Sequence, residues 1–346
     1  MDNLTHGLFG LAIGALRRPD RKRNRECSTA EGDARLSPTD RAVLVCCVVA
    51  AELPDLDTFW PSGNDVLQAL HAHRGPTHAL LFAPLVALVA VLLVRPLFRG
   101  ADARTMFAWA LPSTLLAHLL ADAWTGWGTR LFLPFSDRRL SLDWTLVVDP
   151  LVTVPLLLGA AVALVLALRQ RARNGWRTAI LCGFALSAAY VGARVAARAE
   201  LIERLGRDYP AASRVEVFPL PFDPITWRYA VQVNERYRVG VIRPFGARTE
   251  QAVHVAAQTA LPEGAADEPT VREALAWARL PIVTTTRRAE ADGGGYSVRI
   301  ADLRYHFGGA PTLAFHFELA PDGTMKSARF DRGGSARELL RRLRDQ

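Results

Sequence analysis

The sequence predicts an α-helical membrane domain with five or six membrane helices, followed by a mainly β (α+β) soluble C-terminal domain. Three observations lead to this prediction. Half of the 346 residues are hydrophobic, and the mean hydropathy of +0.10 is high for a soluble chain. Long apolar runs lie between residues 41 and 198, and an alternating pattern follows them. We therefore expect a membrane domain over 1–198 and an accessory domain over 199–346.

A membrane-spanning helix needs about 20 mostly apolar residues. Four segments meet this requirement: His78 to Val94, Met106 to Ala121, Thr145 to Leu168 and Thr178 to Val195. The run from Arg41 to Leu53 is shorter but strongly apolar. Leu4 to Leu16 is also short, and it could form a half-span or a re-entrant helix. The total is five or six membrane elements.

Basic residues predict which side of the membrane each loop faces. The loops Arg17–Arg41, Arg95–Arg104 and Arg169–Arg177 alternate along the chain and hold 15 Lys/Arg residues. The opposite loops hold four before the C-terminal domain, namely Arg74, Arg130, Arg138 and Arg139. The positive-inside rule makes the first set cytoplasmic. In a bacterial inner (plasma) membrane, the N-terminus and the C-terminal domain then face the extracytoplasmic side.

Two other classes of protein fit the composition less well. The net charge of +8 could suit a nucleic-acid binder, but its basic residues lie mostly in short loops between apolar runs, so no nucleic-acid partner is expected. The four cysteines form no C-x-x-C pair, so they predict neither a disulfide framework nor a thiolate metal site. The expected partner is the lipid bilayer, and the sequence does not indicate an oligomeric state.

Histidines and aspartates gather at the predicted outer ends of the membrane helices. This topology places seven candidate metal ligands at one membrane level: His6, Asp55, Asp57, His73, His78, His118 and Asp122. Asp149 lies near the outer start of the fifth helix. Ionisable residues at the membrane threshold are costly and tend to be functional. We therefore expect a metal site at the outer face.

The spacing of these residues supports shared coordination. His118 and Asp122 are four residues apart, so on a helix both side chains project from one face. In "HRGPTH", Thr77 is expected to N-cap a helix that begins at His78, so that His73 and His78 converge from two directions. In "LPDLD", alternation is expected to place both aspartates on the same side.

Imidazole and carboxylate ligands indicate which cofactor to expect. They suit zinc first, with manganese, iron or magnesium as alternatives, and seven candidates leave room for one ion or two. A spare carboxylate, Asp57 or Asp149, is a candidate general base. Arg74, inside "HRGPTH", is a candidate ligand for an anionic group such as phosphate. We count these three as candidate catalytic residues.

The motifs together resemble the YdjM/YbcI-like family of inner-membrane proteins over roughly residues 1 to 200. The matching stretches are "NLTHG", "LPDLD", "HRGPTH", "HLLADAWTGWGTRLFLPFS" and "VVDP". "HRGxTH" followed by H-x-x-x-D is fairly specific as a set, although each piece is weak alone. The resemblance implies a multi-pass inner-membrane protein that acts as a metal-dependent hydrolase.

The remaining segments predict a lid and a β domain. Thr125 to Thr145 is aromatic and glycine-rich; its tryptophans suit an interfacial belt, and the alternative is a lid whose Arg138 and Arg139 hold an anion. After residue 199, strands are expected over 214–222, 227–242, 296–307 and 312–319, with hairpin turns at "ADGGG" and "APDGT". Helices are expected at 273–280 and in the basic tail 335–346.

These inferences predict a membrane-embedded metal-dependent hydrolase that cleaves an ester or phosphoester of a lipid or lipid-linked substrate, using a water activated by the metal. The first alternative is a non-enzymatic metal-binding membrane protein that acts through its C-terminal domain. The second alternative is an ion transporter, which predicts ionisable residues spread in depth across the bilayer.

Overall fold

The computed structural model of the chain divides into two compact units. It describes residues 1–18, 36–60, 65–67, 69–70, 73–169, 175–221, 223–234, 236–246, 248–255, 261–289, 294–307 and 310–331. The helical unit comprises Met1–Asp57 and Arg74–Ala197. The C-terminal unit comprises Thr58–His73 and Arg198–Gln346. Most of the arginine-rich loop after Arg17 and all of the predicted tail helix 335–346 lie outside the described residues.

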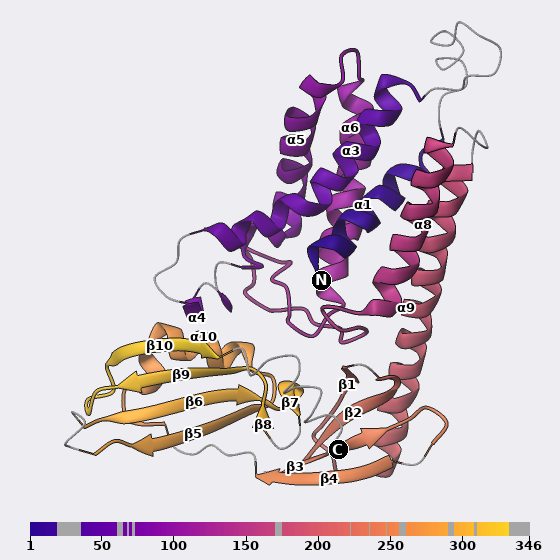
Figure 1. Cartoon of the computed structure of the whole chain (residues 1–346). Coiled ribbons are helices and arrows are strands. Elements are labelled where there is room, and N and C mark those ends of the chain that lie inside the picture. The colour runs from indigo at the N-terminus through magenta and orange to yellow at the C-terminus, as the bar shows by residue number, and fades with distance from the viewer. Residues whose placement is uncertain are drawn as a thin grey trace, which may run out of the picture. The chain divides into compact units, whose positions relative to one another are not determined.

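Helices make up the first unit (Figure 1). Its α-helices are α1 (Asn3–Leu16), α3 (Pro38–Glu52), α5 (Ala83–Val94), α6 (Ala103–Pro112), α7 (Ala121–Ala123), α8 (Pro150–Leu168) and α9 (Gly175–Asp208), the last of which ends in the C-terminal unit. The connecting 3-10 helices are η1 (Leu53–Phe59), η3 (Pro76–His78), η4 (Leu80–Phe82) and η5 (Arg95–Leu97). A π-helix, η6 (Ser113–Leu120), continues α6 after Pro112.

Polar side chains fix where the helices begin. The Asp2 carboxylate accepts a hydrogen bond from Thr5 N, and Asp102 and Asp149 cap α6 and α8 in the same way. Ser37 and Asp40 form a reciprocal capping box at the start of α3. Each cap satisfies a backbone N–H that has no partner within its helix. The helix starts therefore follow from local sequence.

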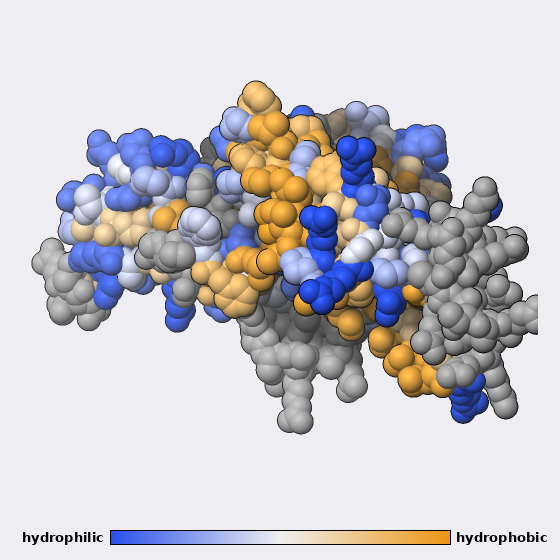
Figure 2. All heavy atoms as spheres, turned by 90° about the horizontal axis from the view of Figure 1, so that it is seen from above, coloured by the Kyte–Doolittle hydropathy of each residue, from blue (hydrophilic) through white to orange (hydrophobic). Residues whose placement is uncertain are grey.

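Four helical stretches are long and apolar enough to cross a membrane: Leu80–Leu97, Ala103–Ala123, Pro150–Leu168 and Gly175–Asp208. They overlap the four segments predicted above. Asn3–Leu16 is apolar but shorter, so a count of five or six spans is not confirmed. Leucines and valines along α5 and α8 are exposed, and Figure 2 shows apolar side chains over much of the helical unit's surface. Lipid would cover such a surface in a spanning protein.

Glycines bring the backbones of two helix pairs close together. A Cβ added at Gly10 of α1 would lie 2.5 Å from the Cys47 carbonyl oxygen of α3. A Cβ at Gly159 of α8 would lie 2.6 Å from the Ala179 carbonyl oxygen of α9. Small residues let membrane helices pack at short range. This close packing holds α1, which carries His6, against α3.

Two antiparallel sheets form most of the C-terminal unit (Figure 1). The first has the order β1–β2–β3–β4, formed by Arg214–Leu220, Asp223–Val233, Arg236–Ile242 and Arg248–Val255. The second has the order β10–β9–β6–β5, formed by Met325–Asp331, Ala314–Leu319, Tyr296–Asp302 and Pro281–Arg287. A small antiparallel pair, β7 (His306–Phe307) and β8 (Ala310–Pro311), completes the strands that the structure describes. The unit also contains two helices, α4 (Asp65–Leu67) and α10 (Pro269–Trp277).

The sheet pattern confirms a β-rich C-terminal region. Each predicted strand region contains at least one observed strand, and the "APDGT" turn closes with a 2.8 Å hydrogen bond from Ala320 N to Thr324 O. Trp277 of α10 packs edge-on against Phe315 of β9, with ring centroids 5.2 Å apart. α10 begins at Pro269, four residues before the predicted start, because Pro269 suits the first turn of a helix.

Candidate metal centre

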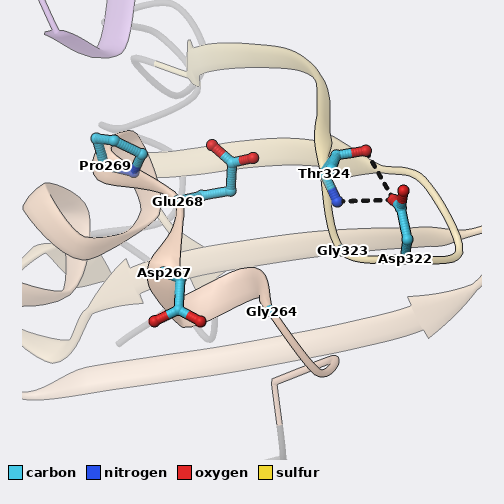
Figure 3. Close-up of a pocket in the computed structure, with 7 residues that line it drawn as sticks. All are labelled: Gly264, Asp267, Glu268, Pro269, Asp322, Gly323 and Thr324. Atoms are coloured by element: carbon cyan, nitrogen blue, oxygen red, sulfur yellow. Dashed lines mark hydrogen bonds between the residues drawn. The ribbon is translucent and has the colours of Figure 1, made fainter.

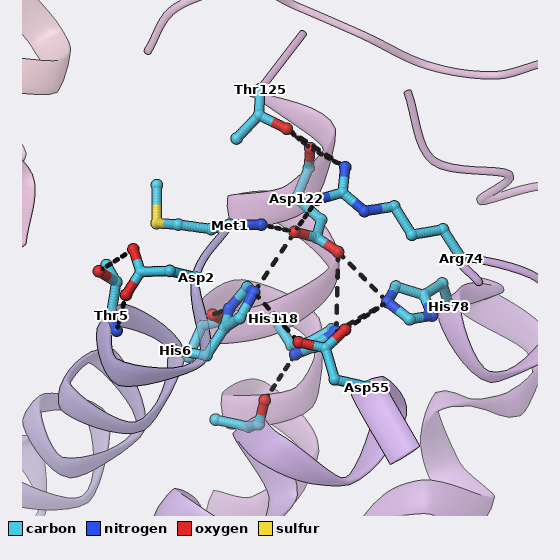
Figure 4. Close-up of polar contacts among 12 residues, drawn as sticks. Met1, Asp2, Thr5, His6, Asp55, Arg74, His78, His118, Asp122 and Thr125 are labelled. Carbon is cyan, nitrogen blue, oxygen red and sulfur yellow. Dashed lines mark hydrogen bonds and ion pairs between the residues drawn. The ribbon is translucent and has the colours of Figure 1, made fainter. Parts of the chain in front are cut away.

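Five elements deliver the side chains of a buried polar cluster in the helical unit (Figure 4). Its potential ligands are His6 from α1, Asp55 from η1, His78 from η3, His118 from η6 and Asp122 from α7. All five residues are buried. His6 and Asp122 come from α-helices, whereas the other three come from 3-10 or π-helical segments.

Four of these residues fall within one coordination sphere. Asp55, His78, His118 and Asp122 each offer one ligand atom, and these atoms all lie within 4.8 Å of one another. His78 Nε2 is 3.4 Å from Asp55 Oδ1 and 3.2 Å from Asp122 Oδ2. His118 Nε2 is 2.9 Å from His78 Nε2. The spacing of "HLLAD" thus places His118 and Asp122 together as predicted, with 3.7 Å between Nε2 and Oδ2.

His6 adds a third imidazole to the cluster. Its Nε2 lies 3.3 Å from Asp122 Oδ1 and 4.0 Å from Asp55 Oδ2. Its ring stacks on that of His118, with centroids 4.1 Å apart. Five of the seven candidate ligands, although they lie far apart in the sequence, thus lie together in one buried cluster.

A second layer of contacts fixes the orientation of each imidazole. His6 Nδ1 lies 2.7 Å from Ala117 O, and His118 Nδ1 lies 2.5 Å from Ala51 O. A carbonyl can only accept, so each Nδ1 carries the proton and each Nε2 presents a lone pair to the cluster. Metal-binding histidines are commonly oriented by such bonds. Sequence reasoning missed these carbonyls, because backbone acceptors leave no residue-type signal.

Asp57 occupies this second layer beside His78. Its Oδ2 lies 3.1 Å from His78 Nδ1, and it also accepts hydrogen bonds from Arg74 N at 3.1 Å and Thr77 Oγ1 at 2.7 Å. Asp55 therefore faces one ring nitrogen of His78 and Asp57 faces the other.

Asp55 and Asp57 each offer a carboxylate oxygen, and these two oxygens lie within 4.8 Å of one another, although the local structure is not the one expected. The strand-like alternation assumed for them does not occur, because η1 continues directly from α3 as a 3-10 helix. The prediction that Thr77 caps a helix beginning at His78 is wrong. Thr77 lies inside η3, which has no side-chain cap, and its hydroxyl donates a hydrogen bond to Asp57.

Arg74 supports the cluster from beside Asp122. Its Nη2 lies 2.8 Å from Asp122 Oδ1, and its Nη1 donates to Thr125 Oγ1 at 3.2 Å. The residue is buried and has a φ of 59°, a region that non-glycine residues seldom adopt. Thr125 was not singled out in the sequence, although it lies three residues after Asp122. The Met1 amine also contacts the Asp122 carboxylate (Figure 4).

The donor set fits a divalent metal ion. Among the described residues, His6 Nε2 and Asp122 Oδ2 are buried and have no hydrogen-bond partner. Burying polar atoms without partners is costly, and a cation between them would satisfy both. Three imidazole nitrogens and two carboxylates suit zinc, manganese or iron. The buried cluster could therefore hold a metal ion.

Asp149 and His73 are predicted site residues that are not counted in this five-residue cluster. Asp149 caps α8: its Oδ1 accepts from Leu151 N at 3.1 Å and its Oδ2 from the Tyr190 hydroxyl at 3.2 Å. His73 is half-buried and belongs, with the segment 58–73, to the C-terminal unit, so its metal role stays a prediction. Trp124, which directly precedes the segment Thr125 to Thr145, is buried in the core of the helical unit.

The C-terminal unit contains a separate acidic pocket (Figure 3). It is lined by Gly264, Asp267, Glu268, Pro269, Asp322, Gly323 and Thr324. The Asp322 carboxylate accepts from Thr324 N and Oγ1, and Glu268 accepts from Met325 N at 3.0 Å. These two carboxylates stabilise local turns, and the pocket has no imidazole among its lining residues.

Membrane-spanning helices around a buried His/Asp cluster define a multi-pass membrane protein with a candidate metal centre. The chain belongs to the YdjM inner membrane protein family, whose model matches residues 1–201. It is 33% identical to the inner membrane protein YbcI of Escherichia coli (strain K12) over 108 residues, which cover 30% of this chain and 61% of YbcI. The chain thus spans less than two thirds of that relative. No solved structure matches it.

Proposed function

We propose that this chain is a membrane-embedded, metal-dependent hydrolase that cleaves an ester or phosphoester of a lipid or lipid-linked substrate. The observation that carries the proposal is the convergence of three imidazole Nε2 atoms on two buried carboxylates. Neither the family name nor the relative's name assigns a reaction, so the chemistry of the donors is the main support.

His6, Asp55, His78, His118 and Asp122 would hold the metal. A divalent ion in such a site polarises a bound ester and lowers the pKa of a coordinated water toward neutrality. The residues around it keep the ligands in place: Ala117 O and Ala51 O orient two imidazoles, and Asp57 orients the third. Burial of the ligands excludes bulk water, which strengthens every charge interaction at the centre.

We assign Asp57 and Asp149 positioning roles in place of the predicted general-base roles. Asp57 Oδ2 already meets three groups, and Asp149 uses both oxygens to hold α8 and Tyr190. Arg74 neutralises Asp122 and ties it to Thr125. A substrate phosphate that reached Arg74 would have to compete with that ion pair.

The position of the centre along the helices supports a lipid substrate. His78 lies two residues before the span Leu80–Leu97, and Asp122 lies at the end of the span Ala103–Ala123. The two spans alternate in direction, so both residues lie at the same membrane boundary. A substrate at that boundary is within reach of the ester and phosphate groups of lipids.

We also propose that this boundary faces the extracytoplasmic side, from the distribution of basic residues described above. Epitopes inserted after Gly100 and after Asp137 test the orientation in spheroplasts of a bacterial host. The tag after Asp137 should be accessible from outside, and the tag after Gly100 only after permeabilisation. The reverse pattern would contradict the orientation and leave the metal centre untouched.

Activity is tested in proteoliposomes loaded separately with zinc, manganese, iron or magnesium. The assay measures products released from a panel of ester and phosphoester lipids by mass spectrometry. We expect turnover of at least one lipid class, lost in His118→Ala and kept in Asp102→Asn, whose carboxylate caps α6. A metal-loaded protein that turns over no member of the panel would count against the hydrolase proposal.

One observation favours a second candidate, a non-enzymatic metal-binding membrane protein. The cluster offers five ligands, and all of them are buried. Closed sites are typical of structural metals, whereas catalytic sites keep a coordination position for water or substrate. X-ray absorption spectroscopy of the metal-loaded protein distinguishes the two. An ion with only His and carboxylate donors supports the structural role, and a coordinated water supports catalysis.

A further inference from the structure

The turn that follows the metal-bearing helix exposes two aromatic side chains. Residues 131–136, "LFLPFS", are named here the LFLPFS turn. Phe135 is 85% exposed and Phe132 is 46% exposed, although both are large and apolar. Exposed apolar side chains that lie together commonly mark a contact surface.

Backbone and side-chain contacts fix this turn to the start of a membrane span. Leu80, the first residue of the span Leu80–Leu97, donates its N–H to Leu131 O at 3.0 Å. The Leu131 side chain is buried against Ala83, Leu119 and Ala123. The base of the LFLPFS turn is therefore held at the level where α5 and its preceding turn enter the membrane.

The span to which the turn is bonded also begins with exposed apolar residues. Leu80 and Leu81 are exposed, as are many leucines further along α5, where lipid is the expected neighbour. Immediately after Phe135 the exposed residues become polar: Ser136, Asp137 and Arg138. A change from apolar to polar residues over a few positions is typical of a segment that enters the headgroup region.

We propose that the LFLPFS turn is a membrane anchor, with Phe132 and Phe135 inserted into the interfacial layer of the bilayer that the helices span. The occupant we commit to is lipid, because the turn is hydrogen-bonded to the first residue of a membrane span whose own leucines are exposed.

The anchor also lies next to the metal ligands in the fold. Leu131 packs on Leu119 and Ala123, which adjoin His118 and Asp122 in the chain. An anchor at this point would set the depth of both ligands relative to the lipid headgroups. This inference does not depend on hydrolysis, since it concerns only where the turn sits.

Photo-crosslinking in proteoliposomes of phosphatidylethanolamine and phosphatidylglycerol tests the proposal. The full chain carries p-benzoylphenylalanine in place of Phe135, of Phe132 or, as the matched control, of Asp137, whose side chain is 88% exposed on the same loop. Intact mass spectrometry quantifies lipid adducts after irradiation. We expect several-fold more lipid adduct at positions 132 and 135 than at 137.

Two results would overturn the anchor. One is a lipid yield at 132 and 135 no higher than at 137. The other is a dominant chain-to-chain adduct at these positions, which would make the turn an interface between copies. p-Benzoylphenylalanine resembles the phenylalanine that it replaces at positions 132 and 135. If the variant at position 135 does not fold, the lipid yield at position 132 tests the anchor.

Discussion

Replacing Asp57 with alanine should weaken metal binding without abolishing it. Asp57 Oδ2 orients His78 through Nδ1 at 3.1 Å, whereas Asp55 approaches His78 Nε2 from the other edge of the ring. Loss of such an orienting carboxylate typically reduces metal affinity about 10- to 100-fold, which corresponds to about 1.4 to 2.8 kcal/mol. Asp57 is buried, so solvent does not reduce this effect appreciably.

The same substitution should also lower stability, because the Thr77 hydroxyl and the Arg74 N–H lose a buried acceptor, at about 1 to 3 kcal/mol each. The assay is the metal Kd, measured by chelator competition on folded, detergent-solubilised protein. Asp102→Ala is the matched control, since it removes a helix cap that costs about 1 kcal/mol and lies outside the cluster. An unchanged Kd in Asp57→Ala, or complete loss of metal as in a ligand variant, would refute the positioning role.

Three further outcomes are expected. Gly10→Val should destabilise the helical unit by about 1 to 3 kcal/mol, because its Cβ would lie 2.5 Å from Cys47 O. Thermal unfolding measures this loss, and it should show none for Gly206→Ala, where an added Cβ meets nothing within 4 Å. Burial, and then the charge of Arg299, lower the pKa of His316, so the unfolded state binds more protons and stability should fall as the pH drops below about 6.5. That pH dependence of the melting temperature should diminish in His316→Gln, and an equal slope in both proteins would count against it. Saturating metal at about 100 times its Kd should add about 2.7 kcal/mol of stability over chelated protein, and identical melting curves with and without chelator would contradict this.

Patterns with a fixed period predicted the elements of this fold. Apolar runs located the four spans, and alternation after residue 199 located strands of both sheets, because these patterns report which faces are buried. Short 3-10 and π-helical turns have no comparable pattern. The continuation of α3 into η1 through Pro54, and of α6 into η6 through Pro112, was therefore not predictable from the sequence.

The same distinction applies to the metal centre. Residue type and the expected membrane level were enough to predict that five residues come together: His6, Asp55, His78, His118 and Asp122. The direction of each side chain was not available, so the contact of Asp57 with the Nδ1 atom of His78 could not be predicted. Chemistry alone identifies which residues can bind a metal, whereas backbone geometry decides which of them face it.

The most direct test of this account is the metal content of the purified protein. Elemental analysis of detergent-solubilised wild type, His118→Ala combined with Asp122→Ala, and His316→Ala should follow expression in metal-supplemented medium. The account predicts a stoichiometric divalent metal in the wild type and in His316→Ala, and loss of that metal in the double variant. Wild-type protein without metal, or equal metal in wild type and double variant, would contradict the claim that this cluster is a metal centre.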